Sequence, residues 1–230
     1  MGTENLGNLG HWIRDYLHAI HKQSLAFIYR KPPRHYLEHI IDGKKPVILI
    51  PGIFEKWHFL KAVADPLSLL GHPIYVLERM GYNTREIPHS AKLIRELIEE
   101  KNLRHVVIVA HSKGGLIGKY VLAFYNQDKR VEKVIAIATP FKGSAMATFI
   151  PGKAAEELSP RSKIIETLSE RKEVNHKITS VFGVFDNHVW PESSCSLEGA
   201  KNIQVEVRGH HKILFDKKVR EIVVSEIETA

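Results

Sequence analysis

The sequence predicts an α/β fold in which a mostly parallel central sheet of about six strands carries helices on both faces. Four of six strand-like runs are nearly continuous in apolar residues, which is typical of strands covered on both sides. Helical patterns alternate with several of these runs, as they do in doubly wound sheets. The six runs cover residues 46–52, 73–78, 105–112, 131–140, 177–186 and 202–209.

Length and composition indicate one large domain preceded by an extension. The chain has 230 residues, 43% of them hydrophobic and 26% charged, so it is long enough to bury a sizeable core. We assign residues 46–230 to this domain and residues 1–45 to an N-terminal helical extension. The single cysteine, Cys195, rules out an internal disulfide and fits a reducing compartment. Without an apolar run of membrane-spanning length or a signal-peptide pattern, we expect a soluble cytoplasmic protein.

The net charge of +7 does not by itself indicate a nucleic-acid partner. Lysines and arginines are scattered among acidic residues and form no basic run interleaved with aromatic side chains. We therefore expect no nucleic-acid binding. The basic, amphipathic pattern around residues 12–20 is compatible with contact to an anionic membrane surface, and nothing in the sequence defines an oligomeric state.

Two segments show the helical period most clearly. Residues 90–102 carry a one-sided apolar stripe, and Ser90 is placed to cap its N-terminus. Residues 216–227 repeat the pattern, although Glu226 narrows the stripe near its end. Histidine pairs within residues 1–45 have helical spacing, but no carboxylate or cysteine pattern accompanies them, so we expect no metal site.

One stretch, residues 106–120 (VVIVAHSKGGLIGKY), passes from a buried strand through a serine into a helix with little room for a turn. Ser112 falls at the corner, and Ala110, Gly114 and Gly115 are small enough for the two backbones to approach closely. The first amides of the helix point at the same place and would stabilise negative charge there. The pattern favours a nucleophilic serine, with an ordinary tight turn as the alternative.

Residues 110–114 (AHSKG) resemble the G-x-S-x-G nucleophile elbow of the α/β-hydrolase family, with alanine first as in some small bacterial lipases. The resemblance extends over residues 46–230 and implies a triad in the order Ser, Asp, His. It assigns the acid to Asp186, which opens DNHVWP after a strand, and the base to His210, which follows a strand and a glycine. His211 is the rival base, and an Asx-turn residue is the alternative for Asp186.

The same resemblance implies an oxyanion hole built from two backbone amides. One belongs to Lys113, the residue after the nucleophile. The other belongs to Ile53, in the loop VILIPGIFEKW, with Phe54 as its neighbour. Here Pro51 stands where many relatives have histidine, and a plain strand-exit turn is the alternative.

The segment over residues 141–172 is too long for a plain connection between strands, so it is either a cap over a site or a structural excursion. Its start, TPFKGS, resembles the start of a short lid in lipases and esterases. An apolar substrate pocket is expected from Phe54 and the lid residues Phe141, Met146, Phe149 and Ile150, unless the lid side chains only pack the segment onto the core.

The resemblance as a whole implies a serine hydrolase, an esterase or lipase that cleaves small-molecule or lipid esters through an acyl-enzyme intermediate. This chemistry requires no cofactor. Two alternatives stay open: an acyltransferase that uses the same triad, and a non-catalytic ligand receptor on the same scaffold.

Overall fold

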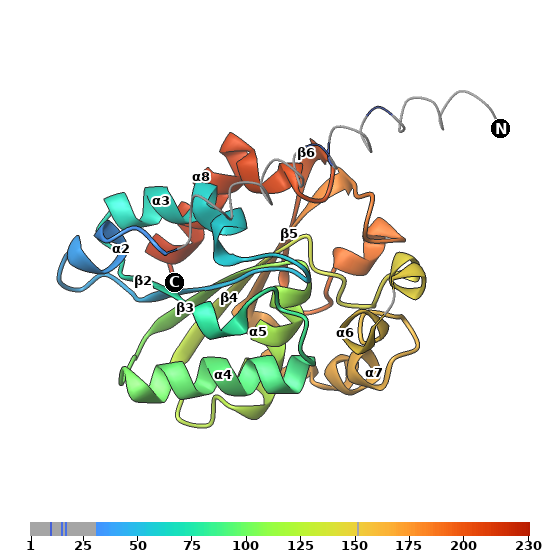
Figure 1. Ribbon diagram of the computed structural model, residues 1–230, viewed down its shortest axis with the longest axis horizontal. Helices are drawn as coiled ribbons and strands as arrows, with labels where there is room; N and C mark the ends of the chain where they lie inside the picture. The colour runs from blue at the N-terminus through green and yellow to red at the C-terminus, as the bar shows by residue number, and fades with distance from the viewer. Residues whose placement is uncertain (1–9, 11–14, 16, 18–30, 151) are drawn as a thin grey trace.

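A computed structural model gives the fold of the chain (Figure 1), and the structure describes residues 10, 15, 17, 31–150 and 152–230. A single six-stranded parallel sheet lies at the centre, with strand order β2-β1-β3-β4-β5-β6. The predicted fold class and all six predicted strands are therefore confirmed. The strands are β1 (Val47–Ile50), β2 (Ile74–Val76), β3 (Val106–His111), β4 (Val131–Ile137), β5 (Ile178–Phe185) and β6 (Lys201–Arg208).

Helices connect the strands and cover both faces of the sheet (Figure 1). The described α-helices are α2 (His35–Glu38), α3 (Lys61–Leu69), α4 (Ile87–Glu100), α5 (Lys113–Phe124), α6 (Lys153–Glu156), α7 (Lys163–Glu170) and α8 (Lys217–Glu228). Short 3-10 helices are η1 (Trp57–Leu60), η2 (Glu78–Met80), η3 (Ala145–Phe149), η4 (Lys172–Lys177), η5 (Glu192–Cys195) and η6 (Lys212–Phe215).

The pleat of the strands divides the apolar side chains into two cores. In β3, Val107 and Val109 pack toward the face covered by α3 and α8, whereas Ile108 and Ala110 pack toward α4 and α5. All four side chains are fully buried. Burial on both faces is the reason why this strand is an uninterrupted apolar run in the sequence.

Helix α4 begins earlier than its sequence pattern predicts. Its first residue is Ile87 and its N-cap is Glu86, so the assignment of Ser90 as the cap is wrong. Pro88 lies in the first turn, where the missing amide hydrogen costs no helical hydrogen bond. Ser90 is instead buried inside the helix, where its hydroxyl donates to Oδ1 of Asn83 at 3.3 Å.

Helix α8 carries the apolar face that the sequence predicts, and Asp216 caps its start by accepting from the amide of Val219 at 3.2 Å. The carboxylate of Glu226, which narrows the stripe, is buried. It accepts from Lys133 Nζ and Thr179 Oγ1, each at 2.8 Å. The carboxylate is therefore tolerated at the sheet because its charge is paired there.

The described residues before β1 pack against the rest of the structure. Tyr36 in α2 is buried, and its hydroxyl donates to Asp65 in α3 at 2.9 Å. The amphipathic helix expected around residues 12–20 lies, apart from Asp15 and Leu17, outside the described residues. In the part of the chain that is described, no helix is long and apolar enough to cross a membrane.

Candidate active site

Ser112 stands at the corner between β3 and α5 with φ +52°, a backbone conformation that residues other than glycine rarely adopt. A Cβ on Gly114 would lie 2.3 Å from the carbonyl oxygen of Ile50. A Cβ on Gly115 would lie 2.0 Å from Oγ1 of Thr139. The two glycines therefore let the helix start against β1 and the end of β4, which leaves Ser112 at the N-terminus of α5.

Asp186 and His210, which follow β5 and β6, form a hydrogen-bonded pair. Nδ1 of His210 lies 2.7 Å from Oδ2 of Asp186. The other carboxylate oxygen accepts from the amides of His188 at 2.7 Å and Val189 at 2.9 Å. The amide of His210 donates to Oδ1 of Asn187 at 2.9 Å. These bonds fix the orientation of both side chains and leave Nε2 of His210 facing away from the carboxylate.

The electrostatics of the pair keep Asp186 ionised. Burial alone would raise its pKa, but the attraction of His210 and the hydrogen bonds from His210, His188 and Val189 lower the pKa below the ordinary value. Unlike Asp186, His188 is uncharged. Burial, followed by the electrostatic influence of the His210 and His211 rings, lowers the pKa of His188 to about 3, so this imidazole is neutral near pH 7.

His211, the rival base, lies between two carboxylates. Its Nδ1 is 2.9 Å from Oδ2 of Asp15, and its Nε2 is 3.3 Å from Oε1 of Glu55. Burial opposes the charged ring, but the hydrogen bonds to Asp15 and Glu55 outweigh it and raise the pKa of His211 to about 10. An imidazolium has no lone pair left to accept a proton, so His211 is poorly suited to act as a base.

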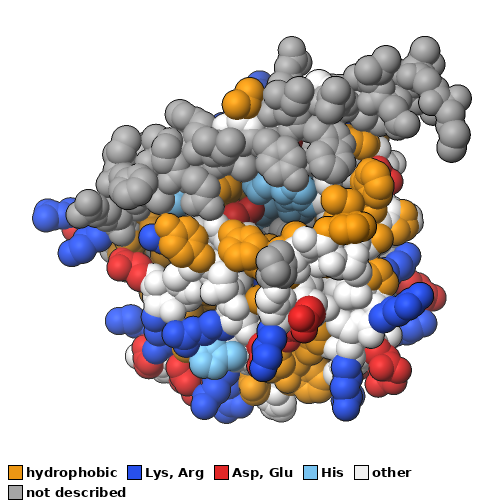
Figure 2. All heavy atoms as spheres, turned by 45° about the vertical axis from the view of Figure 1, so that its right-hand side comes forward, with side chains coloured by type: hydrophobic (Ala, Val, Ile, Leu, Met, Phe, Trp, Pro, Cys, Tyr) orange, Lys and Arg blue, Asp and Glu red, His pale blue; other side chains and the backbone are white. Residues whose placement is uncertain are grey.

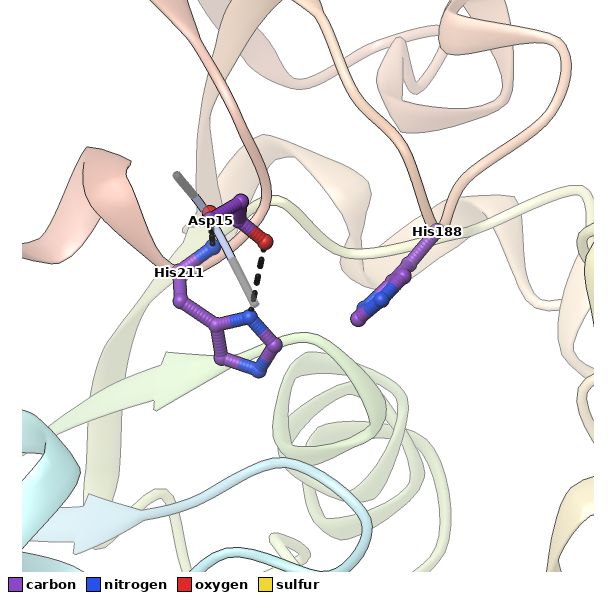
Figure 3. Close-up of side chains that lie close together, drawn as sticks. All are labelled: Asp15, His188 and His211. Atoms are coloured by element: carbon purple, nitrogen blue, oxygen red, sulfur yellow. Dashed lines mark hydrogen bonds and ion pairs between the residues drawn. The ribbon is translucent and has the colours of Figure 1, made fainter. Parts of the chain in front are cut away.

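Asp15, His188 and His211 each bring one potential metal-ligand atom within 4.8 Å of the others, and Figure 3 shows the three side chains facing one another. Asp15 and His211 are already hydrogen bonded, as the dashed lines mark, and the second oxygen of Asp15 accepts from the amides of His211 and Lys212 at 2.8 and 3.0 Å. A cation would have to displace the proton that His211 holds. The contacts are therefore satisfied as a buried ion pair.

An apolar cavity of about 220 Å³ opens over Ser112 and His210. Figure 2 shows this opening as a hollow with histidine side chains inside and hydrophobic side chains around it. The cavity is lined by Ile53, Phe54, Glu55, Phe59, Ser112, Pro140, Ser144, Ala147, Ile150, Leu158, His188, Val189, His210 and His211.

Of the five side chains expected to bind substrate, Phe54 and Ile150 are among these described lining residues. Phe141 is buried in the hydrophobic core instead, and Phe149 is 80% exposed. Met146 is half-buried in η3. Phe141, Met146 and Phe149 are not among the described residues that line this cavity, and their part in substrate binding stays a prediction. The residues of segment 141–172 that do line it are Ser144, Ala147, Ile150 and Leu158.

The two backbone amides expected to form an oxyanion hole belong to Ile53, which lines the cavity, and Lys113, the first residue of α5. Within the described part of the chain, neither amide donates a hydrogen bond. The side chain of Lys113 is buried and donates to the carbonyl oxygen of Asn83 at 3.3 Å and to that of Arg85. The lysine side chain is long enough to reach from the start of α5 to the loop after η2, and its hydrogen bonds hold that loop in place.

Sequence analysis missed Glu55, His111 and Asp15, which are buried around the candidate triad. The ring of His111 lies 4.6 Å from that of His210, measured between ring centroids. A charged residue three positions after Gly52 is a weak signal on its own, because exposed loops commonly carry such residues. Only the burial of Glu55 in the folded chain makes it unusual.

Comparison with known proteins agrees with this architecture. The α/β hydrolase fold family matches residues 45–158. A triacylglycerol lipase of Pseudarthrobacter phenanthrenivorans is 28% identical over 116 residues, which are 46% of this chain and 36% of the lipase. A triacylglycerol lipase of Pseudomonas fragi is 22% identical over 135 residues, which are 54% of this chain and 45% of the lipase. The matches therefore span less than half the length of these relatives.

Solved structures extend the similarity to most of the chain. Lipase B of Aspergillus fumigatus superposes with a TM-score of 0.73 at 19% identity, covering 86% of this chain and 55% of that one. The mature lipase BlEst2 of Bacillus licheniformis gives 0.64 at 16% identity, covering 83% and 95%. At such identities the likeness shows the fold alone. The chain is thus an α/β-hydrolase-fold protein whose distant relatives include triacylglycerol lipases.

Proposed function

We propose that this protein is a serine hydrolase that cleaves carboxylic esters, with Ser112 as nucleophile, His210 as base and Asp186 as the orienting acid. One observation carries the proposal: His210, which is paired with Asp186 at 2.7 Å, lines the same apolar cavity as Ser112, which sits on a strained turn. Distant relatives described as triacylglycerol lipases support ester substrates. Each role follows from the proton transfer or charge stabilisation that the side chain can perform at its position.

The reaction begins with proton transfer from the hydroxyl of Ser112 to Nε2 of His210, while the oxygen attacks the ester carbonyl carbon. The amides of Ile53 and Lys113 stabilise the oxyanion, and the N-terminus of α5 adds to this field. His210 then protonates the leaving alcohol. A water molecule, deprotonated by His210, attacks the acyl-enzyme; the bond to Ser112 breaks, His210 returns the proton to the serine oxygen, and the carboxylic acid leaves. Asp186 stays ionised throughout and stabilises the imidazolium.

The cavity favours an ester with an apolar acyl group. Its lining is mostly apolar side chains, and the neutral ring of His188 adds no charge to it. The lid segment over residues 141–172 supplies part of the roof through Ala147, Ile150 and Leu158. The charged lining residues Glu55 and His211 already face each other, so a charged acyl chain would lose its hydration against the apolar side chains without a free partner, which costs several kcal/mol.

A fluorophosphonate probe tests the proposal, because it phosphonylates only an activated serine. We expect one adduct by intact mass on the native chain and none on Ser112→Ala, together with hydrolysis of p-nitrophenyl esters that the variant lowers at least about 1000-fold. Peptide mapping separates Ser112 from Ser144, the other serine that lines the cavity.

An adduct on Ser144, or undiminished hydrolysis by Ser112→Ala, would contradict the proposal. A labelled Ser112 without ester turnover would contradict hydrolysis and favour transfer of the acyl group to an acceptor other than water. An unlabelled native chain would favour a non-catalytic receptor.

A further inference from the structure

A buried carboxylate outside the candidate triad connects the parts of the site. Glu55 lies in the loop after β1 and is only 3% exposed. Its Oε2 accepts from the amide of Gly52 at 2.7 Å, and its carboxylate lies 2.9 Å from Nδ1 of His111. The carboxylate packs closely against Gly52, where a Cβ would lie only 3.0 Å from it. A residue larger than glycine would therefore crowd the carboxylate at this position. The loop that carries Ile53 is therefore shaped around Glu55.

His111 carries this connection on to the loop of the base. Its Nε2 lies 3.0 Å from the carbonyl oxygen of His210, and a carbonyl only accepts, so this nitrogen donates. The ring is fully buried directly before Ser112. The amide of Gly52, the carboxylate of Glu55, the ring of His111 and the backbone of His210 thus form one chain of hydrogen bonds, which joins the connections after β1, β3 and β6.

His211 and Asp15 extend the network to the N-terminal segment (Figure 3). His211 faces Asp15 with one ring nitrogen, and its other ring nitrogen lies 3.3 Å from Oε1 of Glu55. Two imidazole rings and two carboxylates alternate, so the four groups balance in charge when all are ionised. Burial alone would raise the pKa of Glu55, but His111 and His211 hold it well below the ordinary range. Glu55 is therefore an anion inside the site.

A negative charge at this place matters for His210, which becomes an imidazolium during the reaction. The rings of His111, His188 and His211 all lie within reach of it, with centroid distances of 4.6, 4.8 and 5.2 Å. Any positive charge on these neighbours opposes the imidazolium. Asp186 contacts His210 directly, while Glu55 and Asp15 offset the charge of the surrounding rings.

We propose that Glu55 is a positioning residue, which holds the Ile53 loop and the His210 loop in register through His111 and offsets the positive charge around His210. This role rests on the proposed hydrolase function. A network that only stabilised the fold would change the amount of folded protein, whereas Glu55 acts on the rate and on its pH dependence.

The test compares Glu55→Gln with the native chain, using hydrolysis of p-nitrophenyl butyrate normalised to the sites that a fluorophosphonate titrates. We expect kcat to fall about 10-fold or more with KM within about two-fold. Loss of the negative charge disfavours the protonated base, so the acid limb of the rate profile moves to lower pH, by roughly half a unit or more. Asp15→Asn should move the limb in the same direction by a smaller amount.

Glu226→Gln is the matched control, because Glu226 is also a buried carboxylate with several hydrogen bonds but lies in α8, outside the cavity lining. It should lower stability and leave kcat and the acid limb unchanged. An unchanged kcat and limb in Glu55→Gln would overturn the role of Glu55 alone. A native chain that neither hydrolyses the ester nor takes up the label would overturn the proposed function itself.

Discussion

The strain at Ser112 is the clearest feature at the scale of single residues. A left-handed φ at a serine costs about 1–3 kcal/mol and persists only where the surroundings impose it. Here the amide of Ser112 donates to the carbonyl oxygen of Ile137 at 2.8 Å, and Thr139 Oγ1 donates to the carbonyl oxygen of Ser112 at 2.9 Å. Strand β4 and its exit therefore hold the turn from both sides.

Gly114→Ala tests this close packing. The added methyl group meets the backbone of Ile50 at 2.3 Å, and backbone cannot move aside as a flexible side chain can. We expect a loss of about 1–3 kcal/mol in urea unfolding, together with loss of serine labelling. Gly10→Ala is the control, since nothing lies within 4 Å of the added atom. An unchanged unfolding midpoint for Gly114→Ala would contradict the close approach.

At the scale of elements, the segment over residues 141–172 is held by bonds to the rest of the chain. Its helices are short, and its own side chains bond to backbone groups outside it. Ser144 Oγ donates to the carbonyl oxygen of His188 at 2.7 Å, and Glu157 accepts from the amide of Ile87 at 2.8 Å. The segment is thus tied to the loop after β5 and to the start of α4.

Ile150→Trp should narrow the acyl pocket. Ile150 lines the cavity, and the larger indole side chain would fill part of the cavity's volume of about 220 Å³. If the protein is an esterase, kcat/KM for p-nitrophenyl octanoate should fall about 10-fold relative to the acetate ester. The neighbour Phe149 is 80% exposed, so Phe149→Trp should leave the ratio unchanged. Equal ratios in both variants would place the acyl group elsewhere.

At the scale of the whole molecule, buried ionisable groups determine how stability depends on pH. His211 binds its proton more tightly when folded, with a pKa of about 10 against 6.5. Its contribution is therefore complete below pH 6.5 and is lost as pH rises toward 10. Burial lowers the pKa of Lys113 and Lys119 to about 8. Above pH 8, both lysines therefore increase the free energy of unfolding as the pH rises.

We therefore expect the free energy of unfolding to decrease between pH 6.5 and 8, with a slope of up to about 1.4 kcal/mol per pH unit, and to rise again above pH 8, where two lysines oppose one histidine. Urea unfolding of the native chain and of His211→Asn over this range measures the effect. The variant should lack the decrease. A native chain as stable at pH 8 as at pH 6.5 would rule out a protonated His211 between Asp15 and Glu55.

Much of this molecule follows from local sequence pattern. The strands could be located because burial on both faces requires continuous apolar runs, and the alternation with helices predicts the parallel order. The sequence also placed Asp186 and His210 at the exits of strands that lie side by side, since carboxyl ends of parallel strands meet at one edge. Their catalytic roles stay predictions.

Tertiary structure alone decided the surroundings of the site. His111 and Glu55 are 56 positions apart in the chain, and His211 and Asp15 are 196 apart, so no local pattern links them. The side chains that enter the cavity from the lid depend on how 3-10 and α-helical turns rotate, which composition does not specify. Local spacing determines where strands and helices form, whereas packing between distant segments determines which charges are buried and paired.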